Sequence, residues 1–336
     1  MNEPTDAGGR IWPFRIACAI LVMLLPALLG LPRTIQAGPL EAVVGVRATI
    51  PANARTAHVL GMEREGSGMV IAEDGLVLTI GYLILEADTA EILLPGDRVV
   101  PAEIVAYDYD TGFGLLRPLA ELDIEPVPLG SSNKLSEHSE VLVTSFGSLE
   151  PATAAYVVSR RDFAGYWEYL LPDAIFTAPP HQGYGGAGLL GPDGRLLGIG
   201  SLFVSDAAEG RHLPGNMFVP IDALRPILAE LLERGRASKP ARPWLGVYAE
   251  EVRGRVIVNR VASYGPAAAA GLEIDDIILA VKDAPVSSLA DFYRKMWRLG
   301  DAGVEVPLTV LRGSTPTEIT VTSGDRYDYL KLKPSH

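Results

Sequence analysis

The sequence predicts a mainly β protein in which a long all-β unit is followed by a smaller α+β module. From residue 40 to about residue 220, short apolar runs alternate with turn signals at regular spacing, a pattern typical of a β-barrel or sandwich. Residues 221–234 then carry a helical stripe of apolar side chains. Residues 236–243 combine three basic residues with two prolines, which favours a semi-rigid linker.

The order of the elements follows from these patterns. In the β unit, an Asp-Gly turn at 74–75 divides a hairpin. The strands expected in this unit are 42–50, 68–80 with its break at 73–75, 90–94, 98–107, 113–116, 140–146, 154–160, 187–190, 195–203 and 216–220. A helix over 221–234 ends at Gly235. In the second module we expect strands at 245–252, 256–261, 277–281, 305–311 and 318–322, with helices at 266–270 and 288–298.

Composition excludes several classes of function. The chain has 336 residues and a formal net charge of −12, which argues against a nucleic-acid partner because phosphate binding needs a basic face. Its one cysteine, Cys18, lies in an N-terminal apolar run, so no disulfide within the chain and no cysteine-based metal site is expected. The histidines show no metal-ligand spacing, and we expect no metal and no cofactor.

The N-terminus has the pattern of an export segment. Arg10 and Arg15 precede an apolar run from Ile16 to Leu31. This run is short for a membrane-spanning helix, but counting from Ile11 makes it long enough, so a cleaved signal and an uncleaved anchor both remain open. Either alternative places the rest of the chain outside the cytoplasm, in the periplasm or cell envelope, secreted or attached to the membrane.

Three segments of the β unit resemble trypsin-like proteases of the HtrA/Deg family. Residues 66–68 and 74–79, Gly-Ser-Gly and Asp-Gly-Leu-Val-Leu-Thr, are similar to the strand pair before the catalytic histidine. Residues 185–187 and 191–199 resemble the segment after the nucleophilic serine, and residues 216–221 resemble the strand that closes the second barrel. The resemblance implies two six-stranded β-barrels.

The second module resembles a bacterial PDZ domain. The match runs through Trp-Leu-Gly-Val at 244–247, Gly-Pro-Ala-Ala-Ala-Ala-Gly-Leu at 265–272 and Asp-Asp-Ile-Ile at 275–278. The predicted division is an export segment at 1–39, a trypsin-like double barrel at 40–235, a linker at 236–243, a PDZ domain at 244–326 and a tail at 327–336.

The resemblance also implies that the catalytic triad has been replaced. A serine protease needs a hydroxyl nucleophile, an imidazole base and an orienting carboxylate. By the family's motifs, Tyr82 stands at the histidine position, Gly112 at the aspartate position and Tyr184 at the serine position. No histidine occurs from 59 to 137 and no serine between 160 and 200, so no shift of register restores the base or the nucleophile. Asp110 lies two residues from the expected acid.

Other residues near these positions admit more than one interpretation. Gln182, next to Gly183, stands where the family has a glycine in the oxyanion loop. This change puts in doubt whether the backbone N–H groups of the loop can point at an oxyanion. His181 is either a repurposed base or a loop histidine at the rim of a cleft, and we favour the second. An aromatic cluster lies around residues 162–165 and suits either a ligand cleft or, as we favour, a core or barrel-rim role. Its members are Tyr156, Tyr166, Trp167 and Tyr169.

Three functions compete on this basis. The first is a non-catalytic, peptide-binding scaffold or regulator of the cell envelope, which the loss of the triad together with the retained PDZ motif favours. The second is an active periplasmic serine endopeptidase of protein quality control with a non-standard catalytic site. The third is an unrelated enzyme on the same barrels with His181 and Tyr184 as an acid–base pair. Homo-oligomer formation is left open.

The PDZ resemblance implies a peptide site. PDZ domains bind extended peptides or protein C-termini by strand addition, and a loop of backbone N–H groups holds the terminal carboxylate. The matching loop is Trp244, Leu245, Gly246 and Val247. Phe292 and Met296 of the 288–298 helix are expected to form one wall of the pocket for the last side chain.

Overall fold

The computed structural model describes residues 38–332. Of the predicted export segment at 1–39, residues 1–37 lie outside the described residues. Within the described part of the chain, none of the helices combines the length and the apolar character needed to cross a membrane.

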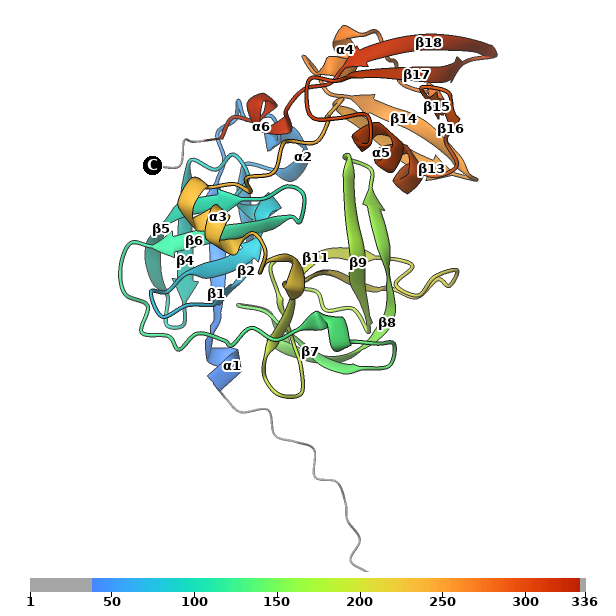
Figure 1. Cartoon of the computed structure of the whole chain (residues 1–336). Coiled ribbons are helices and arrows are strands. Elements are labelled where there is room, and N and C mark those ends of the chain that lie inside the picture. The colour runs from blue at the N-terminus through green and yellow to red at the C-terminus, as the bar shows by residue number, and fades with distance from the viewer. Residues whose placement is uncertain (1–37, 333–336) are drawn as a thin grey trace, which may run out of the picture. The chain divides into compact units, whose positions relative to one another are not determined.

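The first six strands close into a barrel in the order β1-β2-β3-β6-β5-β4 (Figure 1). Antiparallel pairing of β1 with β4 completes the ring. The strands are β1 Val43–Thr49, β2 Glu63–Val70, β3 Val77–Ile80, β4 Thr89–Leu94, β5 Arg98–Tyr107 and β6 Phe113–Pro118. Short helical segments in this half are α1 Gly38–Glu41, α2 Ala57–Leu60 and the 3-10 turn η1 Gly81–Leu83.

The next six strands close a second barrel in the order β10-β11-β12-β9-β8-β7. The two longest, β8 and β9, form an antiparallel hairpin with a short tip (Figure 1). The strands are β7 Glu140–Thr144, β8 Ala152–Gly165, β9 Tyr169–Ala178, β10 Gly188–Leu190, β11 Leu196–Val204 and β12 Gly215–Pro220. The 3-10 turns η2 Ser132–Lys134 and η3 Ile221–Ala223 precede and follow this barrel, and α3 Leu228–Arg234 comes after η3. The predicted mainly β class with two six-stranded barrels is confirmed.

The C-terminal module is a sheet in the order β13-β14-β15-β17-β18, with β16 paired to β15. Its strands are β13 Val247–Val252, β14 Arg255–Val261, β15 Ile277–Val281, β16 Ala284–Pro285, β17 Glu305–Arg312 and β18 Thr315–Thr322. Its helices are α4 Pro266–Ala269, α5 Leu289–Trp297 and α6 Arg326–Tyr329. Helix α5 begins where predicted because the Ser288 side chain accepts a hydrogen bond from the Asp291 N–H.

Two predicted elements differ in the structure. The single helix expected over 221–234 is divided into η3 and α3, and Pro226 lies between them. Proline lacks the N–H that a continuous helix needs and disfavours helical backbone in the preceding residue. The structure also contains β9, which the sequence analysis did not predict. Its apolar pattern is interrupted by the adjacent Pro172 and Asp173, and Asp173 has a positive φ of 52°.

The barrels share one apolar core. Phe113 of the first barrel and Phe176 and Met217 of the second are almost fully buried in the same cluster. A separate cluster forms the core of the C-terminal module, and Leu170 of β9 belongs to it. The second barrel and the module are therefore joined by apolar packing as well as by the chain.

Gly186 fixes the loop before β10 against the first barrel. Its φ is +75°, and a Cβ at this position would lie 1.9 Å from the Ser67 carbonyl oxygen and 2.7 Å from Thr79 Oγ1. The backbone here can approach β2 only without a side chain. The same glycine also donates its N–H to the Gly200 carbonyl at 2.9 Å, which ties the loop to β11.

We predict that Gly186→Ala lowers the free energy of unfolding by about 3 kcal/mol or more, because backbone strain and a steric clash add together. The matched control is Gly210→Ala, where φ is +68° but nothing lies within 4 Å of the added Cβ. The control should cost only about 1 kcal/mol from the positive φ. Urea unfolding measures the free energy of unfolding of both variants. Equal decreases would show that the close approach to Ser67 does not contribute to the cost of the Gly186 substitution.

Candidate functional site

The three triad-equivalent positions line one pocket. Tyr82 lies in the turn η1 after β3, Gly112 lies in the turn before β6, and Tyr184 lies in the loop between β9 and β10. The pocket has a volume of about 310 Å³. The structure thus brings together the three residues that the sequence assigned to the vacant catalytic roles.

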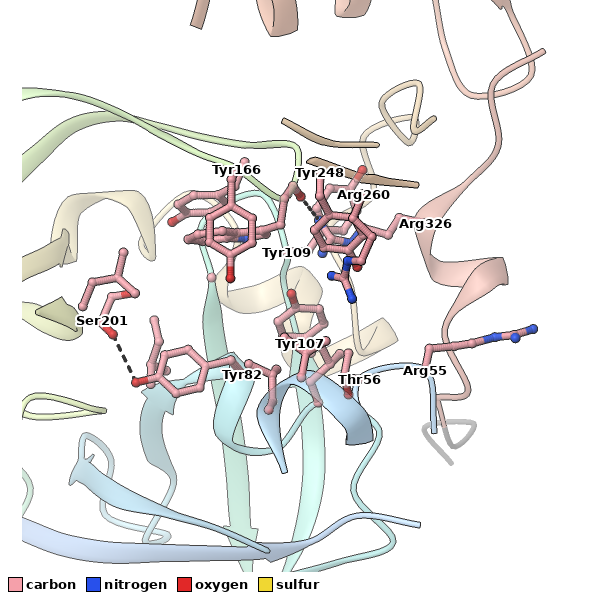
Figure 2. A pocket seen from close by; sticks show the side chains of 18 of the residues that line it. Arg55, Thr56, Tyr82, Tyr107, Tyr109, Tyr166, Ser201, Tyr248, Arg260 and Arg326 are labelled. Atoms are coloured by element: carbon pink, nitrogen blue, oxygen red, sulfur yellow. Dashed lines mark hydrogen bonds between the residues drawn. The ribbon is translucent and has the colours of Figure 1, made fainter. Parts of the chain in front are cut away.

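Tyr82 is held as a neutral phenol. Its hydroxyl donates a hydrogen bond to the Ser201 carbonyl at 3.1 Å (Figure 2). Burial, with a smaller contribution from Tyr184, raises the pKa of the Tyr82 phenol above its usual range. A neutral phenol whose O–H donates a hydrogen bond to a carbonyl oxygen does not take up a second proton. Tyr82 therefore cannot act as a general base in this arrangement.

Gly112 belongs to a tight turn with a φ of +86°. Its N–H donates to the Asp108 carbonyl at 2.7 Å, and its own carbonyl accepts from the Gly81 N–H at 2.7 Å. The nearby acids are engaged elsewhere. Asp110 forms ion pairs with Lys239 and Arg242 of the linker, and neither Asp108 nor Asp110 lines the pocket.

His181 is buried away from this pocket. Its Nε2 is 2.7 Å from Ser145 Oγ, its Nδ1 is 2.8 Å from Thr153 Oγ1, and its backbone N–H donates to Asn216 Oδ1 at 2.7 Å. Burial lowers the pKa of the imidazole below its ordinary value. Both ring nitrogens of His181 are hydrogen-bonded to hydroxyls of the second barrel, which gives the residue a structural role. The imidazole therefore does not form an acid–base pair with Tyr184.

The oxyanion-loop positions border a second pocket of about 440 Å³. Gln182 and Gly183 line it together with Ser67 and Phe146. Tyr82 and Tyr184 line both pockets, so the two phenols lie between them.

The first pocket has aromatic and cationic walls. Arg55, Arg260 and Arg326 line it, and no Asp or Glu occurs among the described residues around it. Figure 2 shows Arg260 beside Tyr248 and Arg326 near Tyr109, whereas Arg55 points away from the group. The guanidinium carbons lie 3.5 Å and 5.3 Å from the centres of those two rings.

The aromatic cluster noted in the sequence contributes to this wall. Trp167 is stacked on Tyr169 at 5.5 Å between ring centres and meets Tyr166 edge-on at 4.9 Å. All three line the pocket, while Tyr169 is also part of the core. Tyr156 stands apart and is exposed.

The predicted carboxylate loop does hold a carboxylate in the structure, and it belongs to Glu168. The N–H groups of Leu245, Gly246 and Val247 donate to the Glu168 side chain at 3.0, 2.7 and 2.7 Å. Glu168 lies at the tip of the β8–β9 hairpin and is buried. Burial raises its pKa to about 7, although the three N–H donors and the charge of Arg326 act in the opposite direction.

The other predicted peptide-site residues are in or beside the core of the module. Leu245, Val247, Phe292 and Met296 are almost fully buried in one cluster. Trp244 packs on Tyr329 at 4.5 Å between ring centres. The sequence analysis did not identify Glu168. Its only local signal is a single acid inside the run Tyr-Trp-Glu-Tyr at 166–169.

Family models match both parts of the chain. A trypsin-like peptidase domain matches residues 66–199, and a PDZ domain matches residues 243–322. A probable periplasmic serine endoprotease, DegP-like, of Pseudomonas putida is 28% identical over 273 residues, covering 77% of this chain and 55% of that protein. The serine endoprotease DegS of Salmonella typhimurium is 25% identical over 288 residues, covering 80% of this chain and 79% of that protein. The chain thus spans only about half the length of the DegP-like relative.

Solved structures show the same fold. The HtrA-type protease AlgW with a decapeptide has a TM-score of 0.52 at 22% identity, covering 90% of this chain and 99% of that chain. AlgW with a tripeptide has a TM-score of 0.51 at 21% identity, covering 90% and 97%.

Proposed function

We propose that this chain, an HtrA/Deg-type trypsin-like peptidase homologue with a C-terminal PDZ domain, is proteolytically inactive and acts in the cell envelope as a peptide-binding scaffold or regulator. The proposal depends on one observation: Tyr82, Gly112 and Tyr184 line a single pocket. By the family's motifs these residues stand at the positions of the base, the acid and the nucleophile. The curated relatives are described as periplasmic serine endoproteases, so an active enzyme with a non-standard site is the alternative.

The chemistry of the pocket supports inactivity. A tyrosine hydroxyl is a weak nucleophile near neutral pH unless a base takes its proton. Tyr184 has Tyr82 as its neighbour in place of an imidazole, and His181 is bound to two hydroxyls elsewhere. Without a base, no general-acid step to the leaving amine is available either.

We expect the purified protein to leave unfolded casein uncleaved and to resist labelling by a fluorophosphonate probe. A relative with an intact triad, treated in parallel, is the positive control. Casein turnover that is abolished by Tyr184→Ala would refute inactivity and favour the alternative.

Tyr184→Ser alone should also remain inactive, because the new hydroxyl has no base. Even the combined change Tyr82→His, Gly112→Asp and Tyr184→Ser has to place an aspartate at a φ of +86°, a strain of roughly 1 kcal/mol or more. We expect partial activity at most from the triple variant, measured by the same casein assay. Efficient cleavage by Tyr184→Ser alone would mean that another group serves as the base.

The PDZ domain supports the binding half of the proposal. Three N–H groups of one loop already converge on a carboxylate, which is the chemistry that holds a peptide C-terminus. The related AlgW is described with bound peptides. The partners proposed here are therefore extended peptides or protein C-termini with an apolar last residue.

A peptide ending in leucine with a free carboxylate should bind the protein with an affinity of roughly micromolar at best, or about 8 kcal/mol. Amidation of that terminus should weaken binding by about tenfold or more, because a charged hydrogen-bond acceptor is lost. Fluorescence anisotropy of the labelled peptide measures both forms. Equal affinity of acid and amide would exclude the carboxylate role.

The charged and apolar pattern at the N-terminus and the periplasmic relatives support export. A fusion of residues 1–60 to a reporter that is active only outside the cytoplasm should give signal. The control is the same fusion with an acidic residue in the apolar run at Leu24. A fusion that is stably made but silent would contradict export.

A further inference from the structure

The tip of the β8–β9 hairpin binds the PDZ domain in the manner expected of a peptide. The Ala249 N–H of β13 donates to the Tyr166 carbonyl at 2.9 Å. Two residues later, the Glu168 carboxylate receives the three N–H groups of the loop before β13. A backbone bond to the edge strand and a carboxylate in the adjoining loop are the two polar elements of peptide recognition by strand addition.

An apolar side chain accompanies this carboxylate. Leu170, 6% exposed, belongs to the same cluster as Leu245, Val247, Phe292 and Met296 of the PDZ domain. The sequence analysis assigned Phe292 and Met296 to the pocket for the last side chain of a peptide, and Leu245 and Val247 to the loop beside that pocket. A C-terminal leucine combines an apolar side chain and a carboxylate in one residue. In the hairpin tip, Leu170 supplies the apolar side chain and Glu168 supplies the carboxylate.

Helix α5 completes the contact. The Tyr293 hydroxyl donates to the Gly165 carbonyl at 2.8 Å and accepts from the Glu168 N–H at 3.2 Å. Arg294 forms an ion pair with Asp162 of β8. The hairpin tip is therefore bound from both sides of the groove, by β13 and its loop on one side and by α5 on the other.

We infer that the β8–β9 hairpin tip is an intramolecular ligand of the PDZ domain, with Glu168 standing in for a peptide C-terminus, and that an apolar-ended C-terminal peptide binds by displacing it. This inference rests on the proposed peptide-binding function. It adds both the partner class, a C-terminus of leucine-like size, and the regulation of the site.

Displacement also changes the pocket at the former catalytic centre. Tyr166 and Trp167 line that pocket and directly precede Glu168 on the hairpin tip. A peptide that takes the place of Glu168 removes part of the pocket's aromatic wall. The groove and the pocket are thus coupled through one element with a docked and a released arrangement.

The test compares variants of the full-length protein with one probe, a fluorescent decapeptide ending in leucine with a free carboxylate. Glu168→Ala removes the competing carboxylate and should tighten peptide binding by at least about tenfold, because the competent fraction of the protein rises. Glu168→Gln keeps the shape and an acceptor oxygen but loses the charge whose burial is unfavourable, so the hairpin tip should stay docked and peptide binding should not tighten. Glu209→Ala, at an exposed site, is the matched control and should bind as the unaltered protein does. Circular dichroism and the urea midpoint establish that each variant is folded.

The outcomes separate this inference from the proposed function. Tighter binding by Glu168→Ala than by Glu209→Ala supports the intramolecular ligand. Equal binding by all folded variants, with the acid preferred over the amide, overturns it and leaves peptide binding intact. No binding by any folded variant overturns both.

The pH dependence of peptide affinity is an independent test of the contact between Glu168 and the loop before β13. Burial in the docked state raises the pKa of Glu168 to about 7, above the ordinary value of about 4.3 expected after release. The docked state therefore holds the extra proton, and docking weakens as the pH rises through 7. Arg326 and Tyr293 are the charged and titratable side chains that face this carboxylate.

Peptide affinity of the unaltered protein should therefore increase by about tenfold between pH 6 and pH 8, and that of Glu168→Ala should stay nearly constant. The carboxylate of the peptide itself is ionised across this range and adds no dependence of its own. The same pH dependence in both proteins would overturn the assignment to Glu168.

Discussion

The Glu168 carboxylate in the loop of the PDZ domain is the contact on which the joining of the two halves depends. Removing a carboxylate from water costs several kcal/mol, and three charge-assisted N–H bonds offset most of that cost. The offset is incomplete, since burial still raises the pKa of Glu168 to about 7. The contact therefore holds the hairpin in place without making it permanent. A peptide carboxylate that offers the same acceptor atoms, and that brings its own apolar side chain, is a matched competitor.

The hairpin turn that makes this contact also lines the pocket that holds Tyr82, Gly112 and Tyr184. The Trp167 carbonyl oxygen accepts a hydrogen bond from Arg326 Nη1 at 3.1 Å, and the Trp167 ring stacks on Tyr169 in the pocket wall. The next residue, Glu168, lies in the PDZ groove. One short turn thus contributes to both sites, and its φ of +55° at Glu168 shows that the surrounding contacts hold a non-glycine residue in an uncommon conformation.

The sequence predicts those parts of the structure that local patterns determine. Helix α5 was located within one residue because its apolar face and the Ser288 cap lie in one short segment. The family motifs placed Tyr82, Gly112 and Tyr184 in roles that meet in one pocket, although nothing local shows that they meet. Glu168 escaped prediction because its partners are three backbone N–H groups almost eighty positions away, and backbone donors leave no trace in residue identity. The missed strand β9 has the same origin, since its pairing with β8 and β12 overrides the break at Pro172.

The loop that leads to Gly112 is tied to the linker by ion pairs. Asp110 is the carboxylate nearest in sequence to Gly112, and it forms ion pairs with Lys239 and Arg242 of the linker to the PDZ domain. Arg242 in turn lies over the ring of Trp297 on α5, 4.4 Å from its centre. Recruiting Asp110 to orient a restored base would release both linker cations and leave the positive charge of Arg242 beside an apolar helix face. A triad that used Asp110 as its acid would therefore break the ion pairs that hold the linker, so this carboxylate can serve only one of the two networks.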